Sequence, residues 1–158
     1  MTSKSTAQDL RPTRDIVQKA TLKALRGRVD EGEVRRFLEK AASNDVPAPI
    51  GATASLKIAV WGKLGCDPDG QPWKYDITVW GGPAYFGESV GFMYTAYETW
   101  DAFFRYVTGA HVQGIAEAGG ILQINWFNES GVPVGQFNGA AGGIGLVEAG
   151  GSGTWQKK

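Results

Sequence analysis

The chain has 158 residues, which is enough for one domain with a substantial hydrophobic core. Sixteen Lys and Arg residues balance sixteen Asp and Glu residues, and this zero net charge argues against a nucleic-acid binder, which normally carries a basic surface. The single cysteine, Cys66, excludes an internal disulfide and a thiolate zinc site.

Residues 1–50 are predicted to form a charged extension that contains two helices. The first helix spans about 13–26, with Thr13 as its candidate N-cap and Gly27 as its end. The second spans 30–42, and its apolar residues fall at helical spacing: Val34, Phe37, Leu38 and Ala41. Such a pair could dock on the rest of the chain, bind a partner or lie on an anionic membrane; the alternative is a solvated, partly disordered extension.

Residues 51–158 are predicted to form a second unit, a Gly-rich antiparallel β-barrel. The boundary lies at 44–51, where two prolines and a glycine oppose helix. All six tryptophans and 21 of the 23 glycines lie from Gly51 onward. Alternating apolar residues predict strands at 54–64, 73–80, 84–95, 110–117, 121–127, 132–137, 143–149 and 153–157.

The connections between these strands have their own signals. A turn is expected at 67–70, with Gly70 in the left-handed conformation, and a tight hairpin turn at Asn138-Gly139. A short apolar helix is expected to begin after the cap Thr99, end before Gly109 and cover an open end of the sheet. In the first strand, Leu56, Ile58 and Val60 are expected to share one face, with Trp61 on the other.

These elements predict an all-β fold, a closed eight-stranded antiparallel barrel with one short helix, preceded by the helical extension. An open sheet of about eight strands would leave two apolar edges that promote aggregation, and closure removes both. Closure needs sharp bends and close backbone approach, which glycine permits. The glycines are therefore interpreted as structural.

One motif resembles a catalytic site. Gly87-Glu88-Ser89-Val90-Gly91 fits the G-x-S-x-G pattern of a nucleophilic serine, and Asp101 and His111 follow in the order found in α/β-hydrolases. That site requires a strand feeding a helix in a parallel sheet, whereas Ser89 lies inside an alternating strand. Ser89 is therefore interpreted as an ordinary strand residue.

The remaining patterns point to no cofactor, metal or catalytic site. The glycine-rich runs 142–145 and 150–153 open no helix that could bind phosphate. Asp67 and Asp69 begin a calcium-like loop whose glycine falls at the wrong position. Five carboxylates could in principle work as acid and base, but nothing in the sequence pairs them: Glu88, Glu98, Asp101, Glu117 and Glu129. We therefore expect no cofactor and no enzymatic activity.

The C-terminal residues resemble a known family. Ile124-Asn125-Trp126-Phe127, Ser130-Gly131, Gly135 and the closing run Gly150 to Trp155 are similar to the strand, hairpin and terminal motifs of the rhodococcal virulence-associated (Vap) proteins. The resemblance covers about 52–158. It implies an eight-stranded Greek-key barrel without catalytic residues, and secreted effectors that help a bacterium survive in macrophage phagosomes.

This resemblance leads to the functional hypothesis. We expect a non-catalytic, monomeric, Vap-like effector that acts through its surface on phagosomal or endolysosomal membranes, on another anionic membrane or on a host protein, and that binds no nucleic acid. The alternative is a small barrel that binds an apolar ligand, with Trp61, Trp80 or Trp126 lining its interior.

Two readings of localisation follow from the sequence. The resemblance implies secretion, but residues 1–15 lack the apolar segment of a signal peptide, and no stretch approaches the ~18 apolar residues of a membrane-spanning helix. Without secretion, we expect a soluble cytoplasmic protein.

Overall fold

The computed structural model describes residue 12, residues 14–142 and residues 144–158. Within them lie the helices α1 (Asp15–Leu25), α2 (Glu31–Ala41) and α3 (Trp100–Tyr106), and a 3-10 turn at Glu117–Gly119. The strands are β1 (Ile50–Pro68), β2 (Trp73–Thr95), β3 (Val107–Ile115), β4 (Ile121–Asn128), β5 (Pro133–Ala140), β6 (Glu148–Ser152) and β7 (Gln156–Lys157).

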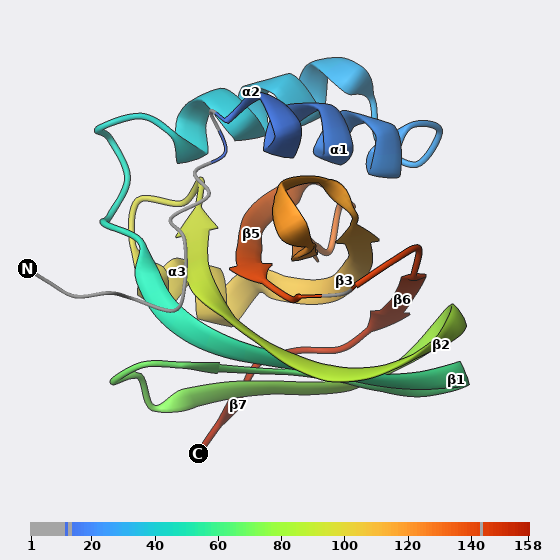
Figure 1. The fold of residues 1–158 in the computed structure, drawn as a ribbon. Helices are drawn as coiled ribbons and strands as arrows, with labels where there is room; N and C mark the ends of the chain where they lie inside the picture. Colours follow the sequence, from blue (N-terminus) through green and yellow to red (C-terminus); the bar gives the residue numbers. More distant parts are fainter. Residues whose placement is uncertain (1–11, 13, 143) are drawn as a thin grey trace, which may run out of the picture.

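Five of these strands form a ring (Figure 1). Strands β2, β5, β4, β3 and β6 pair antiparallel in that order, and β6 also pairs with β2. Strand β1 pairs along β2, and β7 pairs with the start of β2. The spatial order β2-β5-β4-β3 is a Greek key. The predicted all-β antiparallel fold is confirmed.

The predicted number of strands is not confirmed. Residues 73–80 and 84–95, expected as two strands, belong to the single 23-residue strand β2, so the described residues hold seven strands. At the bend in β2, Gly81 has φ +151°, and an added Cβ there would overlap the carbonyl oxygen of Glu148. Glycine thus lets one strand continue past β6 where the sequence analysis expected a break between two strands. Closure of an eight-stranded barrel is not confirmed either.

Three local predictions are wrong. The register of β1 against β2 shifts between Ile58 and Val60, and this bulge turns Val60 outward, with 73% of its surface exposed and φ at +85°. Asn138 and Gly139 continue strand β5 instead of forming a turn. They pair with Gln123 and Leu122 on β4, and this pairing keeps both residues extended. Residues 144–147 form no strand, and β6 begins only at Glu148.

Aromatic side chains fill the space inside the sheet. Trp126 on β4 is fully buried and packs against Tyr75, Phe103 and Trp155, with ring centroids 5.3–5.8 Å apart. Phe103 belongs to α3, whose first turn is capped by Thr99 Oγ1, which accepts a hydrogen bond from the amide of Ala102 at 3.1 Å. The predicted short helix is confirmed, and it inserts apolar rings into the core.

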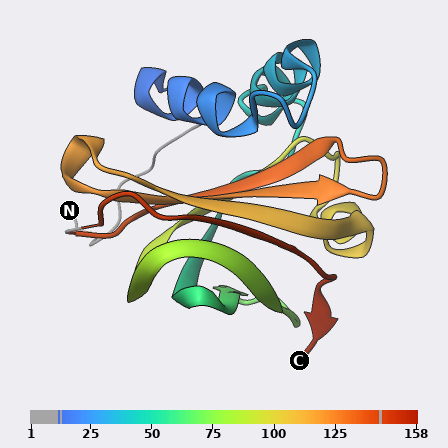
Figure 2. The ribbon, with the colours of Figure 1, turned by 90° about the vertical axis from the view of Figure 1, so that its right-hand side faces the viewer.

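The two N-terminal helices pack on the sheet. They lie side by side over β3, β4 and β5 (Figure 2), and their apolar cluster also includes Tyr94 near the end of β2. The apolar face predicted for α2 is buried there, whereas Thr13, the predicted cap of α1, lies outside the described residues. On α1 the fully buried residues are Val17, Thr21 and Leu25, spaced four residues apart.

Candidate functional site

The three residues of the hydrolase-like pattern are not brought together. Ser89 is buried, and its hydroxyl donates a hydrogen bond to the carbonyl oxygen of Ala140 at 2.8 Å. Asp101 pairs with Arg105 one turn along α3 at 2.7 Å. His111 lies on β3 and contacts Glu148 instead. Each side chain therefore has a different partner.

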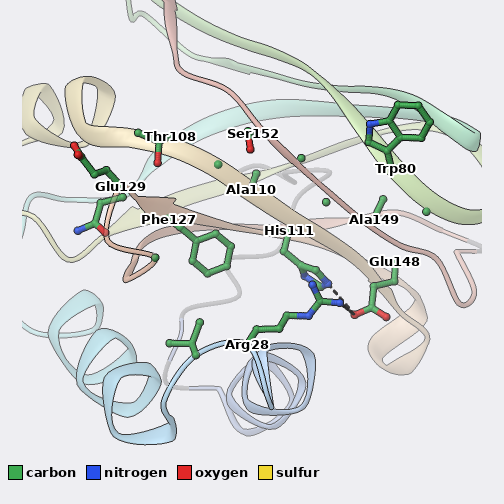
Figure 3. A pocket seen from close by; sticks show the side chains of 17 residues that line it. Arg28, Trp80, Thr108, Ala110, His111, Phe127, Glu129, Glu148, Ala149 and Ser152 are labelled. Carbon is green, nitrogen blue, oxygen red and sulfur yellow. Dashed lines mark hydrogen bonds and ion pairs between the residues drawn. The ribbon is translucent and has the colours of Figure 1, made fainter.

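His111 and Glu148 belong to a surface groove of about 710 Å³ (Figure 3). Strands β3 and β6 lie side by side in it, with Trp80 of β2, the α1–α2 loop and the β4–β5 turn around them. Arg28 comes from the α1–α2 loop, and Glu129 from the β4–β5 turn. The helical pair and the strand ring thus both contribute residues to the groove.

The buried imidazole of His111 is the most unusual titratable group in this groove. Its Nε2 lies 2.8 Å from Glu148 Oε2, and only 2% of the residue is exposed. Burial lowers the pKa of His111 from its ordinary value, Glu148 opposes that shift, and the nearby Arg28 adds to it. An ionised carboxylate only accepts hydrogen bonds, so neutral His111 donates to Glu148 through Nε2–H. In this tautomer Nδ1 carries no proton.

This arrangement holds parts of the groove together but provides few reactive groups. Nδ1 of His111 has no hydrogen-bond partner among the described residues. Arg28 approaches Glu148 at 3.9 Å with both side chains more than half exposed, a geometry that contributes little to stability. In the described part of the chain, no three His, Cys, Asp or Glu residues cluster as metal ligands do.

A second feature, the Trp61–Trp80 patch, borders the groove. It consists of Val60, Trp61 and Trp80, which are 73%, 57% and 62% exposed. Trp61 and Trp80 are cross-strand partners on β1 and β2, with ring centroids 6.4 Å apart. Beside them Lys63 lies 3.6 Å from Asp76. Contiguous exposed apolar side chains are candidates for interaction sites, whereas single ones are ordinary.

The positions of the tryptophans correct the ligand-lined interior considered from the sequence. Trp61 and Trp80 point away from the interior, and the buried Trp126 is packed by other rings on several sides. The sequence carried a signal for the exposed pair. Both tryptophans fall on the polar face of their strands, together with Lys63 and Thr78.

Comparison with known proteins shows similarity in fold. No protein-family model and no curated protein sequence matches the chain. The virulence-associated protein VapB from Rhodococcus equi has a similar structure, with a TM-score of 0.60 and 18% sequence identity over 70% of this chain and 98% of VapB. VapD from the same organism gives a TM-score of 0.56 and 19% identity over 69% and 97% of the two chains.

These two structures support the resemblance found in the sequence. The chain shares its fold with the virulence-associated proteins, and nearly the whole of each solved chain is matched. About 30% of this chain has no counterpart in them, a share close to that of the residues before β1. No helix in the described residues has the length and apolar character needed to cross a bilayer.

Proposed function

We propose that the chain is a non-catalytic, virulence-associated protein of the Vap type that binds membrane surfaces through the Trp61–Trp80 patch. The fold shared with VapB and VapD supports the virulence-associated role. The observation that carries the membrane contact is the exposed tryptophan pair on adjacent strands. The resemblance extends the proposal to a secreted effector on host phagosomal or endolysosomal membranes.

The chemistry of the patch suits the interface between lipid and water. Tryptophan combines a large apolar ring with one polar N–H and is enriched at that interface. Fully burying a large apolar side chain contributes about 1.5–3 kcal/mol, so two tryptophans and a valine support modest, reversible binding. Because the net charge is zero, we expect little added attraction to anionic lipid.

The backbone at the patch also favours a binding role. Val60 is β-branched, yet it is held at φ +85° with its side chain in solvent. Such a conformation costs on the order of 1–3 kcal/mol and is concentrated at functional sites. The bulge therefore exposes an apolar side chain and lowers the stability of the fold. A role of Val60 in binding would explain why this strained conformation is present.

The absence of catalysis is part of the proposal. Its support is that the serine, aspartate and histidine of the hydrolase-like pattern bind three unrelated partners. The apolar-ligand alternative is disfavoured by the packing around Trp126, because the interior between the strands is occupied by aromatic rings.

Vesicle flotation tests this function. The full chain should float with neutral and with anionic vesicles at pH 7 and at about pH 5, and the double variant Trp61→Ala/Trp80→Ala should stay at the bottom of the gradient. Tyr106→Ala is the matched control, because Tyr106 is 58% exposed on α3 outside the patch. Equal flotation of both variants, or none by the wild type, would refute the proposal and direct the search to a protein partner.

A further inference from the structure

The outer face of the sheet beneath α1 is lined with carboxamide side chains. Four of them, on β4 and β5, are fully buried: Gln123, Asn125, Gln136 and Asn138. They pair directly across the two strands, Gln123 with Asn138 and Asn125 with Gln136. Gln113 on β3, partly buried, extends the row opposite Gln123. We call these five residues the carboxamide face.

Hydrogen bonds join all five side chains of the carboxamide face to one another. Gln123 Nε2 donates to Asn138 Oδ1 at 3.0 Å, and Asn138 Nδ2 donates to Gln136 Oε1 at 2.7 Å. Gln136 Nε2 donates to Asn125 Oδ1 at 2.7 Å. Gln123 Oε1 accepts from Asn125 Nδ2 at 3.1 Å and from Gln113 Nε2 at 2.8 Å. The network is therefore internal to the sheet and does not depend on a helix for its connectivity.

Helix α1 adds few polar contacts to this network. Thr21 Oγ1 accepts a hydrogen bond from Gln136 Nε2 at 2.9 Å and donates to Val17 O at 2.7 Å. The carbonyl oxygen of Ala20 accepts from Gln113 Nε2 at 3.1 Å. Val17 packs against Ile115 and Ile121 at one end of the face. The helix is thus held by a central hydroxyl with an aliphatic residue one turn away on each side.

The interface differs in character beneath α2. There Phe37 and Leu38 pack in one cluster with Leu25 of α1 and Tyr94 of β2, and Phe92 and Phe127 lie at its margin. If the helices moved away, water could solvate the carboxamide face, whereas these rings would be exposed at a cost. A displaced helical pair therefore has to be replaced by a segment with the same pattern.

The chain provides such a segment and the means to move it. Residues 42–49 connect α2 to β1, carry Pro47 and Pro49, and form no helix or strand. Interfaces that are partly polar are typical of contacts that open, whereas permanent ones are more apolar. Exchange of an identical element between two copies needs only such a hinge.

We propose that the carboxamide face and the adjoining apolar cluster are a docking surface for an α1–α2 pair, and that the pair of a second copy of this chain can replace the resident one. The surface recognises an aliphatic residue at position i, a hydroxyl at i+4 and an aliphatic residue at i+8 of the helix. Val17, Thr21 and Leu25 are these residues in α1, and all three are fully buried. The partner is therefore this same protein, exchanging its helical pair. This inference is independent of the membrane function.

A labelled synthetic peptide of residues 12–42 tests the exchange on the full-length chain. Thr21→Val in the chain removes the hydroxyl that Gln136 contacts and weakens the resident helix, while Thr21→Ser keeps the hydroxyl and is the control. The peptide should bind the Thr21→Val chain at least tenfold more tightly than the wild-type or Thr21→Ser chain. If Thr21→Val does not fold, Val17→Ala weakens the same helix through its contacts with Ile115 and Ile121.

The result that would overturn the proposal is a folded variant chain that binds no peptide, since Thr21 would then stabilise a helix that does not exchange. A second measurement uses the wild-type chain alone. Size-exclusion chromatography with light scattering at high protein concentration should show a dimer, and excess peptide should convert it to a monomer with peptide bound. A dimer that the peptide leaves intact, or a strictly monomeric chain, would also overturn the proposal.

Discussion

Truncating two tryptophans, one inside the sheet and one in the patch, should have very different effects on stability. Trp126 is fully buried among Tyr75, Phe103 and Trp155, and its indole N–H has no hydrogen-bond partner in the described residues. The cost of Trp126→Ala is therefore a packing and cavity cost, about 3–5 kcal/mol. For a chain of this size, such a loss lowers the melting temperature by about 6–20 °C.

Trp61→Ala is the matched comparison, because Trp61 is 57% exposed and its main ring contact is Trp80. Losing that cross-strand contact should cost less than about 1 kcal/mol. Urea unfolding followed by far-ultraviolet circular dichroism measures both variants without relying on tryptophan emission. Equal losses in the two variants, or a Trp126→Ala chain within 1 kcal/mol of wild type, would refute the distinction between core and patch.

Further substitutions test the strained bulge, the buried histidine and the close approach of strands. Val60→Gly should stabilise the fold by up to about 2 kcal/mol, because glycine relieves the positive φ, yet weaken vesicle binding; a loss of stability would argue against strain. The lowered pKa of His111 means that the unfolded chain binds more protons, so stability should fall as the pH drops below about 6.5; His111→Gln should remove that part of the pH dependence in unfolding measured from pH 8 to 5, and an unchanged profile would contradict the assignment. Gly151→Ala should destabilise the fold by about 1–3 kcal/mol or more, because the added Cβ would overlap the carbonyl oxygen of Thr78. Gly142→Ala is the control and should leave the melting temperature nearly unchanged, because a Cβ there meets nothing within 4 Å. Equal melting temperatures of the two variants would show that β6 and β2 can separate at Gly151.

Local signals predicted most of the elements. The cap at Thr99 and the helical spacing of Val34, Phe37 and Leu38 depend on neighbours within a few residues, and both are present in the structure. The turn near Gly70 is also present, with φ +69°. These features are fixed by residues close in sequence, so the sequence displays them directly.

The errors arose where distant residues decide the outcome. The bulge at Val60 depends on register with β2, to which no local pattern points. Asn138-Gly139 has strong hairpin preference, but Asn138 joins the buried carboxamide network and Gly139 lies against Ser89 of β2. Tertiary contacts therefore override the turn preference of the dipeptide.

The candidate sites show the same division. His111 and Glu148 are 37 residues apart and meet only because β3 pairs with β6. Gln123 and Asn125 alternate with apolar neighbours, as in a strand with one face in solvent, and the packing of the two N-terminal helices buries that face. For the tryptophan pair a local signal existed but was not used: Trp61 and Trp80 were considered only as residues lining the interior, although both occupy the polar face of the alternation.

The measurement that tests the membrane contact most directly is quenching of tryptophan emission by vesicles made with brominated phospholipid. Bromine quenches only rings that enter the bilayer, so the buried Trp126 and Trp155 should not respond. We expect quenching of the wild-type chain, and little or none in a Trp61→Phe/Trp80→Phe variant that keeps two aromatic rings and still binds vesicles. Equal quenching of the two proteins, or bound wild-type chain without quenching, would contradict insertion through the Trp61–Trp80 patch.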